Sequence, residues 1–213
     1  MDFLPSASVM AAFSVAAAIL TLTPGPDMTL FIGRALTQGR AAGFAAMSGA
    51  YCGIVVHTTL AAFGLSALLA ASPKAFLAVK IAGAFYLVWL AVQALRHGSA
   101  LTLERQKGSR QALFQTWLTG IGINLLNPKI VLFFVTFLPQ FVSAGDPNAA
   151  GKLAFLGFYF IVFSLPITSA MVFAADKFAA VLRKSRRVTR SLDYLFAGIF
   201  GAFAAKILLT RSG

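Results

Sequence analysis

The sequence predicts an all-α, polytopic membrane protein with six transmembrane helices, the first and fourth of which break near the bilayer midplane. Hydrophobic residues make up 59% of the 213 residues and charged residues only 11%, whereas a soluble domain carries roughly 25% charged residues. Many apolar runs also reach the ~20 residues that a helix needs to cross a bilayer. Residues 1–213 are therefore expected to form a single transmembrane domain.

Six apolar segments follow one another along the chain. They run from about Pro5 to Leu36, Ala41 to Ala70, Pro73 to Leu95, Ala112 to Val142, Leu153 to Ala175 and Leu192 to Leu209. As straight helices, the first and fourth would be roughly 45 to 50 Å long, which exceeds the ~30 Å bilayer core. Both contain prolines, in TPGPD (23–27) and in NPK (127–129). Because an interior proline removes a helix hydrogen bond, each segment is expected to break there.

The basic residues between the segments predict the orientation of the chain. The first, third and fifth loops carry two, four and six of them, namely Arg34 and Arg40; Arg96, Arg105, Lys107 and Arg110; Lys177, Arg183, Lys184, Arg186, Arg187 and Arg190. By the positive-inside rule these loops are cytoplasmic and both termini lie outside, unless the break in the first segment leaves the N-terminus inside. The net charge of +12 thus reflects topology and a lipid bilayer partner, and no nucleic acid is expected.

The chain contains little that could hold a metal, a cofactor or a catalytic group. It has one cysteine, Cys52, and two histidines, so neither a disulfide nor a metal-ligand cluster is predicted. Gly49 and Gly53, with Ala45 one turn earlier, form a small-residue stripe of the kind that lets two helices approach closely. This stripe serves either packing within the bundle or a homodimer interface.

The two interrupted segments resemble each other. PDMTLF (26–31) aligns with PKIVLF (128–133), which places Pro26 over Pro128 and Asp27 over Lys129. Three segments per half is an odd number, so halves of about residues 5–96 and 112–211 would cross the membrane in opposite directions. Matching helix breaks in two inverted repeats are a sequence indication of a transport site.

The break residues predict a binding site at the midplane. A charge there is costly and normally faces a partner or a wet cavity, so Asp27 and Lys129 either pair with each other or flank a small zwitterion. Proline favours the first helical position and Thr or Asn the N-cap. Each break is therefore expected to start a half-helix whose N–H groups attract an anion. The residues concerned are Thr23, Pro24, Gly25 and Pro26 in the first break and Asn127 and Pro128 in the second.

Three further polar residues within the apolar segments are candidate site residues. His57 is a candidate proton relay because its ordinary pKa is near neutral, or it is a hydrogen-bonded residue of the bundle. Tyr51 and Asn124 either line a cavity or hydrogen-bond between helices.

Taken together, the motifs resemble the LysE/RhtB family of bacterial amino-acid exporters. The resemblance rests on PGPD followed by GR (24–34), on NPK followed by FF and FLPQF (127–141), and on their order over about residues 10–210. It implies a six-helix secondary transporter of the inner membrane that exports amino acids or derivatives, driven by the proton gradient. Carried over by position, its motif residues are Pro24, Gly25, Pro26, Asp27, Asn124, Asn127, Pro128 and Lys129. Family members commonly carry Asn in place of Asp27, so this acid either tunes the site or lies outside the shared machinery.

Two other classes of function remain as alternatives. An intramembrane hydrolase needs a base beside its nucleophile, and His57 and His97 are the only histidines. A membrane scaffold without transport activity would leave the paired, charged helix breaks unexplained.

Overall fold

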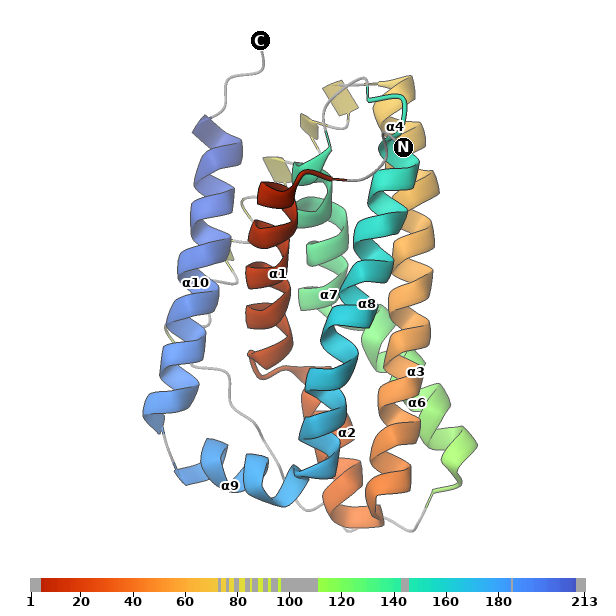
Figure 1. Cartoon of the computed structure of the whole chain (residues 1–213), viewed down its shortest axis with the longest axis vertical. Helices are drawn as coiled ribbons and strands as arrows, with labels where there is room; N and C mark the ends of the chain where they lie inside the picture. The colour runs from red at the N-terminus through yellow and green to blue at the C-terminus, as the bar shows by residue number, and fades with distance from the viewer. Residues whose placement is uncertain are drawn as a thin grey trace.

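The computed structural model describes residues 5–72, 111–142, 146–184 and 186–209, and only individual positions between Lys74 and Arg96. These parts of the chain are mostly helical and contain no strand. Most helices run along the long axis of a bundle, while α9 lies across one end (Figure 1). The predicted third segment is described only at scattered positions, and most of the third loop lies outside the described residues.

Both predicted helix breaks are confirmed. Helix α1 (Ala7–Leu22) ends before the first break and α2 (Pro26–Gln38) begins at its second proline. Helix α6 (Leu113–Leu126) ends before the second break and α7 (Pro128–Leu132) begins at its proline, continuing as η2 (Phe133–Phe137) and η3 (Leu138–Phe141). Each pair of helices is bent by 51° at its break.

Two continuous helices of the described chain are long enough to span a membrane. One consists of α3 (Arg40–Thr59), η1 (Leu60–Leu65) and α4 (Ser66–Ala71), and the other is α8 (Ala149–Phe173). With each bent pair counted as one span, the described residues contain up to four candidate membrane spans. The predicted sixth segment lies in α10 (Arg186–Leu209). The full count of six helices and their inverted repeat remain predictions.

Two predicted loops differ from expectation. The first contains a single non-helical residue, Gly39, whose φ of 93° lies in the left-handed region that glycine favours. The fifth was expected to be a loop, but it contains the helix α9 (Ala175–Lys184) and the start of α10. The spacing of Ala175, Phe178 and Ala179 explains α9, because it places apolar residues on one face of a helix between charged positions.

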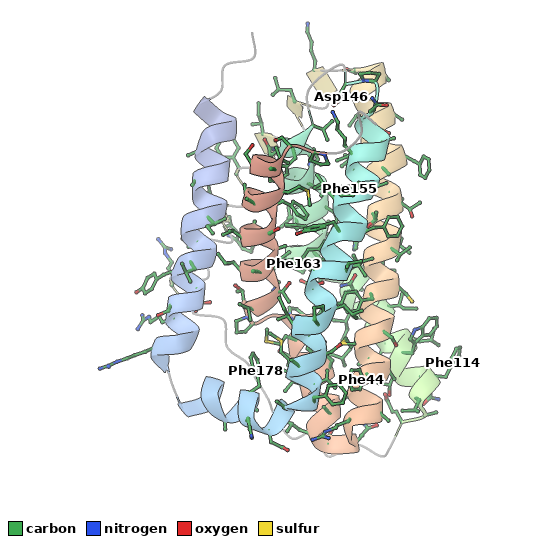
Figure 2. The ribbon with its side chains drawn as sticks, viewed as in Figure 1. Phe44, Phe114, Asp146, Phe155, Phe163 and Phe178 are labelled. Atoms are coloured by element: carbon green, nitrogen blue, oxygen red, sulfur yellow. The ribbon has the colours of Figure 1, made fainter. Side chains whose placement is uncertain are left out.

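Aromatic side chains fill the bundle on one side of the breaks. Phe13 of α1, Phe133 and Phe137 of η2 and Phe160 of α8 are buried in one apolar cluster. Large apolar side chains also point outward, as Phe114 of α6 does in Figure 2. An outer surface of this kind is suited to contact with lipid.

A second apolar cluster lies on the other side of the breaks. It joins Phe31 and Ile32 of α2 to Met171 and Val172 of α8 and to Ala179 of α9. Phe178 of α9 packs against it and points toward the bundle (Figure 2). This cluster attaches α9 to the second half of the first broken helix.

Glycines bring α3 and α6 into close contact. A methyl group on Gly49 would overlap the backbone of Trp117, and one on Gly120 would overlap the backbone of Ala46. A methyl group on Gly53 would overlap the side chain of Asn124. The small-residue stripe of α3 therefore packs within the bundle, and a homodimer would have to use another surface.

Replacing Gly120 by Ala is expected to lower the free energy of unfolding by about 1–3 kcal/mol, because the added methyl group forces α3 and α6 apart. Gly122→Ala on the same helix is the matched control, since a methyl group there meets nothing within 4 Å. Thermal unfolding in detergent measures both variants. Equal melting temperatures for the two would contradict the close packing of these helices.

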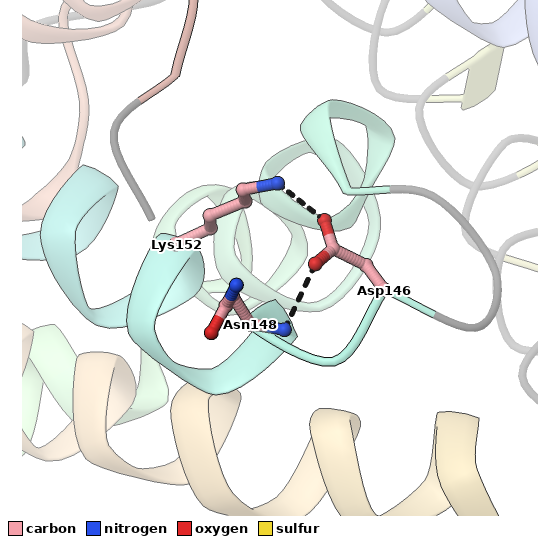
Figure 3. Close-up of polar contacts among 3 residues, drawn as sticks. All are labelled: Asp146, Asn148 and Lys152. Carbon is pink, nitrogen blue, oxygen red and sulfur yellow. Dashed lines mark hydrogen bonds and ion pairs between the residues drawn. The ribbon is translucent and has the colours of Figure 1, made fainter. Parts of the chain in front are cut away.

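The start of α8 is fixed by a small polar motif (Figure 3). One carboxylate oxygen of Asp146 accepts a hydrogen bond from the backbone N–H of Asn148 at 2.9 Å, and the other accepts one from Lys152 Nζ at 2.5 Å. The hydrogen bond from Lys152 lowers the pKa of the Asp146 carboxyl below its ordinary value. Asp146 thus stays ionised at neutral pH and occupies the N-terminus of α8, where negative charge is favourable.

Candidate functional site

The two helix breaks lie against each other and exchange polar contacts crosswise. Asp27, in the first turn of α2, accepts a hydrogen bond of 2.8 Å from the side-chain amide of Asn124, in the last turn of α6. Lys129, in the first turn of α7, donates hydrogen bonds to the backbone oxygens of Leu20 at 2.9 Å and Thr23 at 2.7 Å, at the end of α1. The start of α2 is thus hydrogen-bonded to the end of α6, and the start of α7 is hydrogen-bonded to the end of α1.

The contacts of Lys129 explain how a cation is accommodated there. The last carbonyl groups of a helix lack intrahelical partners and carry partial negative charge. The ammonium group of Lys129 satisfies two such groups of α1. No ion pair joins Lys129 to Asp27 among the described contacts, so direct pairing of the two charges is not the arrangement of this conformation.

The prolines determine where the half-helices begin. Thr23, Gly25 and Asn127 each precede a proline and each have an extended backbone, because a following proline disfavours the helical conformation. Asn127 is the N-cap of α7, as predicted, and its side-chain oxygen accepts a hydrogen bond of 3.1 Å from the backbone N–H of Lys129.

The predicted capping role of Thr23 is wrong. Thr23 is the C-cap of α1 and donates its hydroxyl proton to the backbone oxygen of Ile19 at 2.6 Å. The N-cap of α2 is Gly25, which has no side chain with which to cap the helix. The second proline of the motif causes the difference, because it moves the start of α2 beyond the reach of Thr23.

A cavity lies where the two breaks meet. Its volume is about 50 Å³, enough for a few water molecules. Its polar lining comes from α1, α2, α3, α6, α7 and α8, and its apolar lining includes methionine, leucine, isoleucine and phenylalanine side chains. The polar lining residues are Thr21, Asp27, Tyr51, Asn124, Lys129, Ser164 and Thr168.

Two acceptor atoms on residues that line this cavity have no partner. The buried Oδ1 atoms of Asp27 and Asn124 make no hydrogen bond to any described residue. A buried, unpaired carboxylate oxygen is costly. The cavity can therefore accept a proton or a positively charged donor at Asp27.

Hydroxyl groups of α3 and α8 provide further polar lining. The hydroxyl of Tyr51 lies 3.0 Å from Ser164 Oγ and 2.8 Å from Thr168 Oγ1. Tyr51 thus both lines the cavity and connects two helices, which were the two alternatives for it. Ser164 and Thr168 were not among the predicted site residues. Their spacing of four residues on either side of Pro166 was the available signal, because it places both on one face of the helix.

His57 is not among the residues that line the cavity. Its Nε2 atom is 3.4 Å from the backbone oxygen of Asn124, and its ring stacks on Phe134 with ring centroids 5.6 Å apart. This contact is to a backbone oxygen and not to a hydroxyl nucleophile. The role of His57 as a proton relay remains a prediction.

Comparisons with known proteins converge on one class. A family model described as LysE type translocator matches residues 18–211. A homoserine/homoserine lactone efflux protein of Salmonella typhimurium is 29% identical over 202 residues, which cover 94% of this chain and 96% of the relative. A leucine efflux protein of an Enterobacter species is 25% identical over 195 residues, covering 92% of each chain. An uncharacterized membrane protein of Vibrio cholerae is 30% identical over 197 residues, covering 90% of this chain and 92% of the relative. No solved structure matches the chain significantly.

Proposed function

The chain belongs to the LysE type translocator family and is a membrane exporter of amino acids or their derivatives, and we propose that its substrate passes through the cavity between the two helix breaks. The observation that carries this proposal is the unpartnered, buried Oδ1 atom of Asp27, a residue that lines the cavity. The membrane is the bacterial inner membrane in this proposal, with the basic loops on the cytoplasmic side.

The cavity offers complementary groups to a small zwitterion. The substrate ammonium group binds the free Oδ1 atom of Asp27, which is an acceptor. Lys129 uses two of its three N–H donors on carbonyl groups of α1, and its third binds the substrate carboxylate. Charge-assisted hydrogen bonds of this kind are roughly twice as strong as neutral ones.

The remaining lining sets the preference for a substrate side chain. Tyr51, Ser164 and Thr168 present hydroxyl groups, while Met47 and Ile54 provide apolar surface. A short, neutral side chain that ends in a hydroxyl group fits this combination. Homoserine, which appears in the name of one relative, is therefore the substrate we propose to test first.

Export is driven by exchange of substrate for protons at Asp27. The carboxylate accepts either the ammonium group or a proton at the same oxygen, so binding of one excludes the other. A proton that enters from the outside releases the substrate, and loss of that proton to the cytoplasm restores the binding site. This competition links the outward movement of substrate to the inward movement of protons.

Efflux from preloaded proteoliposomes tests the proposal. The panel comprises homoserine, homoserine lactone, threonine, leucine and lysine, each with and without an imposed pH gradient. We expect homoserine to leave fastest and a gradient that is acidic on the receiving side to accelerate it. Absence of efflux for every compound under both conditions, with folded protein in the vesicles, would refute the proposed transport function.

Replacing Gly25 by Ala is expected to reduce export about tenfold. The added methyl group would lie 3.1 Å from Lys129 Nζ and 3.3 Å from its Cε, and displacement of the ammonium group weakens hydrogen bonds worth about 1.5–3 kcal/mol each. Gly33→Ala on the same helix is the control, since nothing lies within 4 Å of a methyl group there. Equal efflux from both variants would show that this contact is unimportant.

A further inference from the structure

The junction between α9 and α10 concentrates positive charge at one end of the bundle. Residues 175–190 contain six basic residues and one acidic residue, Asp176. Helix α9 lies across this end, and α10 turns away from it along the bundle axis (Figure 1). The start of α1 and the end of α10 lie at the opposite end.

The outer face of α10 changes from charged to apolar as the helix leaves this junction. Its exposed residues include Arg187, Arg190, Tyr194 and Leu195, and the spacing of the first three places them on one side of the helix, with Leu195 next to them. Tyr194 is 57% exposed and Leu195 is 51% exposed. Basic residues followed by tyrosine and then leucine match the transition from lipid headgroups to the hydrocarbon region.

Helix α9 lies at the same end of the bundle as the basic start of α10 (Figure 1), and its inner face packs against the bundle. Ala175 and Ala179 are buried and Phe178 is partly buried, all three against the cluster that includes Phe31 and Ile32 of α2. Lys177 is exposed on α9. The apolar face of α9 is thus covered by the bundle, which leaves Asp176 and Lys177 exposed on its outer side.

We propose that Lys177, Arg187 and Arg190 bind the headgroups of anionic phospholipids, with Tyr194 and Leu195 against the start of the acyl chains. Charge complementarity selects an anionic ligand, and the exposed tyrosine and leucine next to the charges select a lipid. A nucleic acid or a soluble phosphate would leave both of these side chains in water. Because α9 packs on α2, such lipids hold the helix that carries Asp27 to the membrane surface.

A fluorescence experiment tests this surface independently of any transported substrate. Tyr194→Trp is introduced into a chain with Trp89→Phe and Trp117→Phe, and the purified full-length protein is placed in phosphatidylcholine vesicles. Brominated phosphatidylglycerol or brominated phosphatidylcholine is added at equal content, and quenching of the introduced indole is measured. One basic residue near a membrane surface raises the local preference for anionic lipid roughly fivefold.

We therefore expect quenching by phosphatidylglycerol to exceed that by phosphatidylcholine, and the excess to fall at high salt. The combination of Lys177→Gln, Arg187→Gln and Arg190→Gln should lower the lipid preference by at least about fivefold. The charge-retaining pair Arg187→Lys and Arg190→Lys should keep it, and Lys74→Gln at another exposed position should have no effect. Equal quenching by the two lipids in the chain with all its charges would overturn the proposal. An excess that survives the triple substitution would also overturn it.

Discussion

Replacing Asp27 by Asn is expected to reduce export severely while the protein still inserts and folds. The substitution keeps the shape of the side chain but removes the negative charge that we propose binds the substrate ammonium group. Hydrogen bonds to charged groups contribute about 1.5–3 kcal/mol, so export should fall by roughly ten- to a hundredfold. Efflux from proteoliposomes measures the loss, and the melting temperature reports on the fold.

The same variant also tests coupling to protons. Any residual efflux from Asp27→Asn should no longer respond to a pH gradient, because the exchangeable proton is lost with the carboxyl group. Asp146→Asn is the matched control, since this acid contacts Asn148 and Lys152 at the start of α8 and does not line the cavity. Export at the normal rate by Asp27→Asn would refute the proposed role of the acid.

The combined substitutions Asp27→Lys and Lys129→Asp are expected to be inactive. If the two charges were needed only to pair with each other, exchanging them would restore activity. In the structure, however, Lys129 is bonded to the backbone oxygens of Leu20 and Thr23. A carboxylate at position 129 would face these oxygens, and an ammonium group at position 27 would face the side-chain amide that now donates to Asp27.

Single substitutions provide the controls for this exchange. Lys129→Ala should abolish export because it removes the donor for the end of α1. Lys129→Arg should retain a part of the activity, since it keeps the charge but its planar group differs in geometry from an ammonium group. Wild-type export by the exchanged double variant would contradict the crosswise contacts and would favour a simple ion pair.

The parts of the fold that follow from local rules were predictable from sequence. The prolines at positions 24, 26 and 128 determine the backbone of the residues before them, so both helix breaks appear where the motifs place them. Asn127 caps α7 for an equally local reason. The repeated motif also marked Asp27 and Lys129 as a related pair before any contact was known.

The contacts between distant segments were not predictable in this way. Lys129 binds backbone oxygens of α1, and backbone groups carry no sequence signature as partners. The cavity wall formed by Ser164 and Thr168 depends on which face of α8 meets Tyr51. The basic residues of α9 indicate a loop between two membrane spans, whereas its apolar residues pack on a cluster formed by other helices.

Cysteine protection tests most directly whether the cavity binds the substrate. Thr168→Cys is made in a Cys52→Ser background, and the rate of alkylation is measured with and without homoserine or any other compound that the efflux panel identifies as transported. Ala180→Cys, on the exposed face of α9, is the control. We expect the substrate to slow alkylation at position 168 alone, and Asp27→Asn to remove this protection. Equal alkylation rates at position 168 with and without the transported compound would contradict the assignment of the cavity as the substrate site.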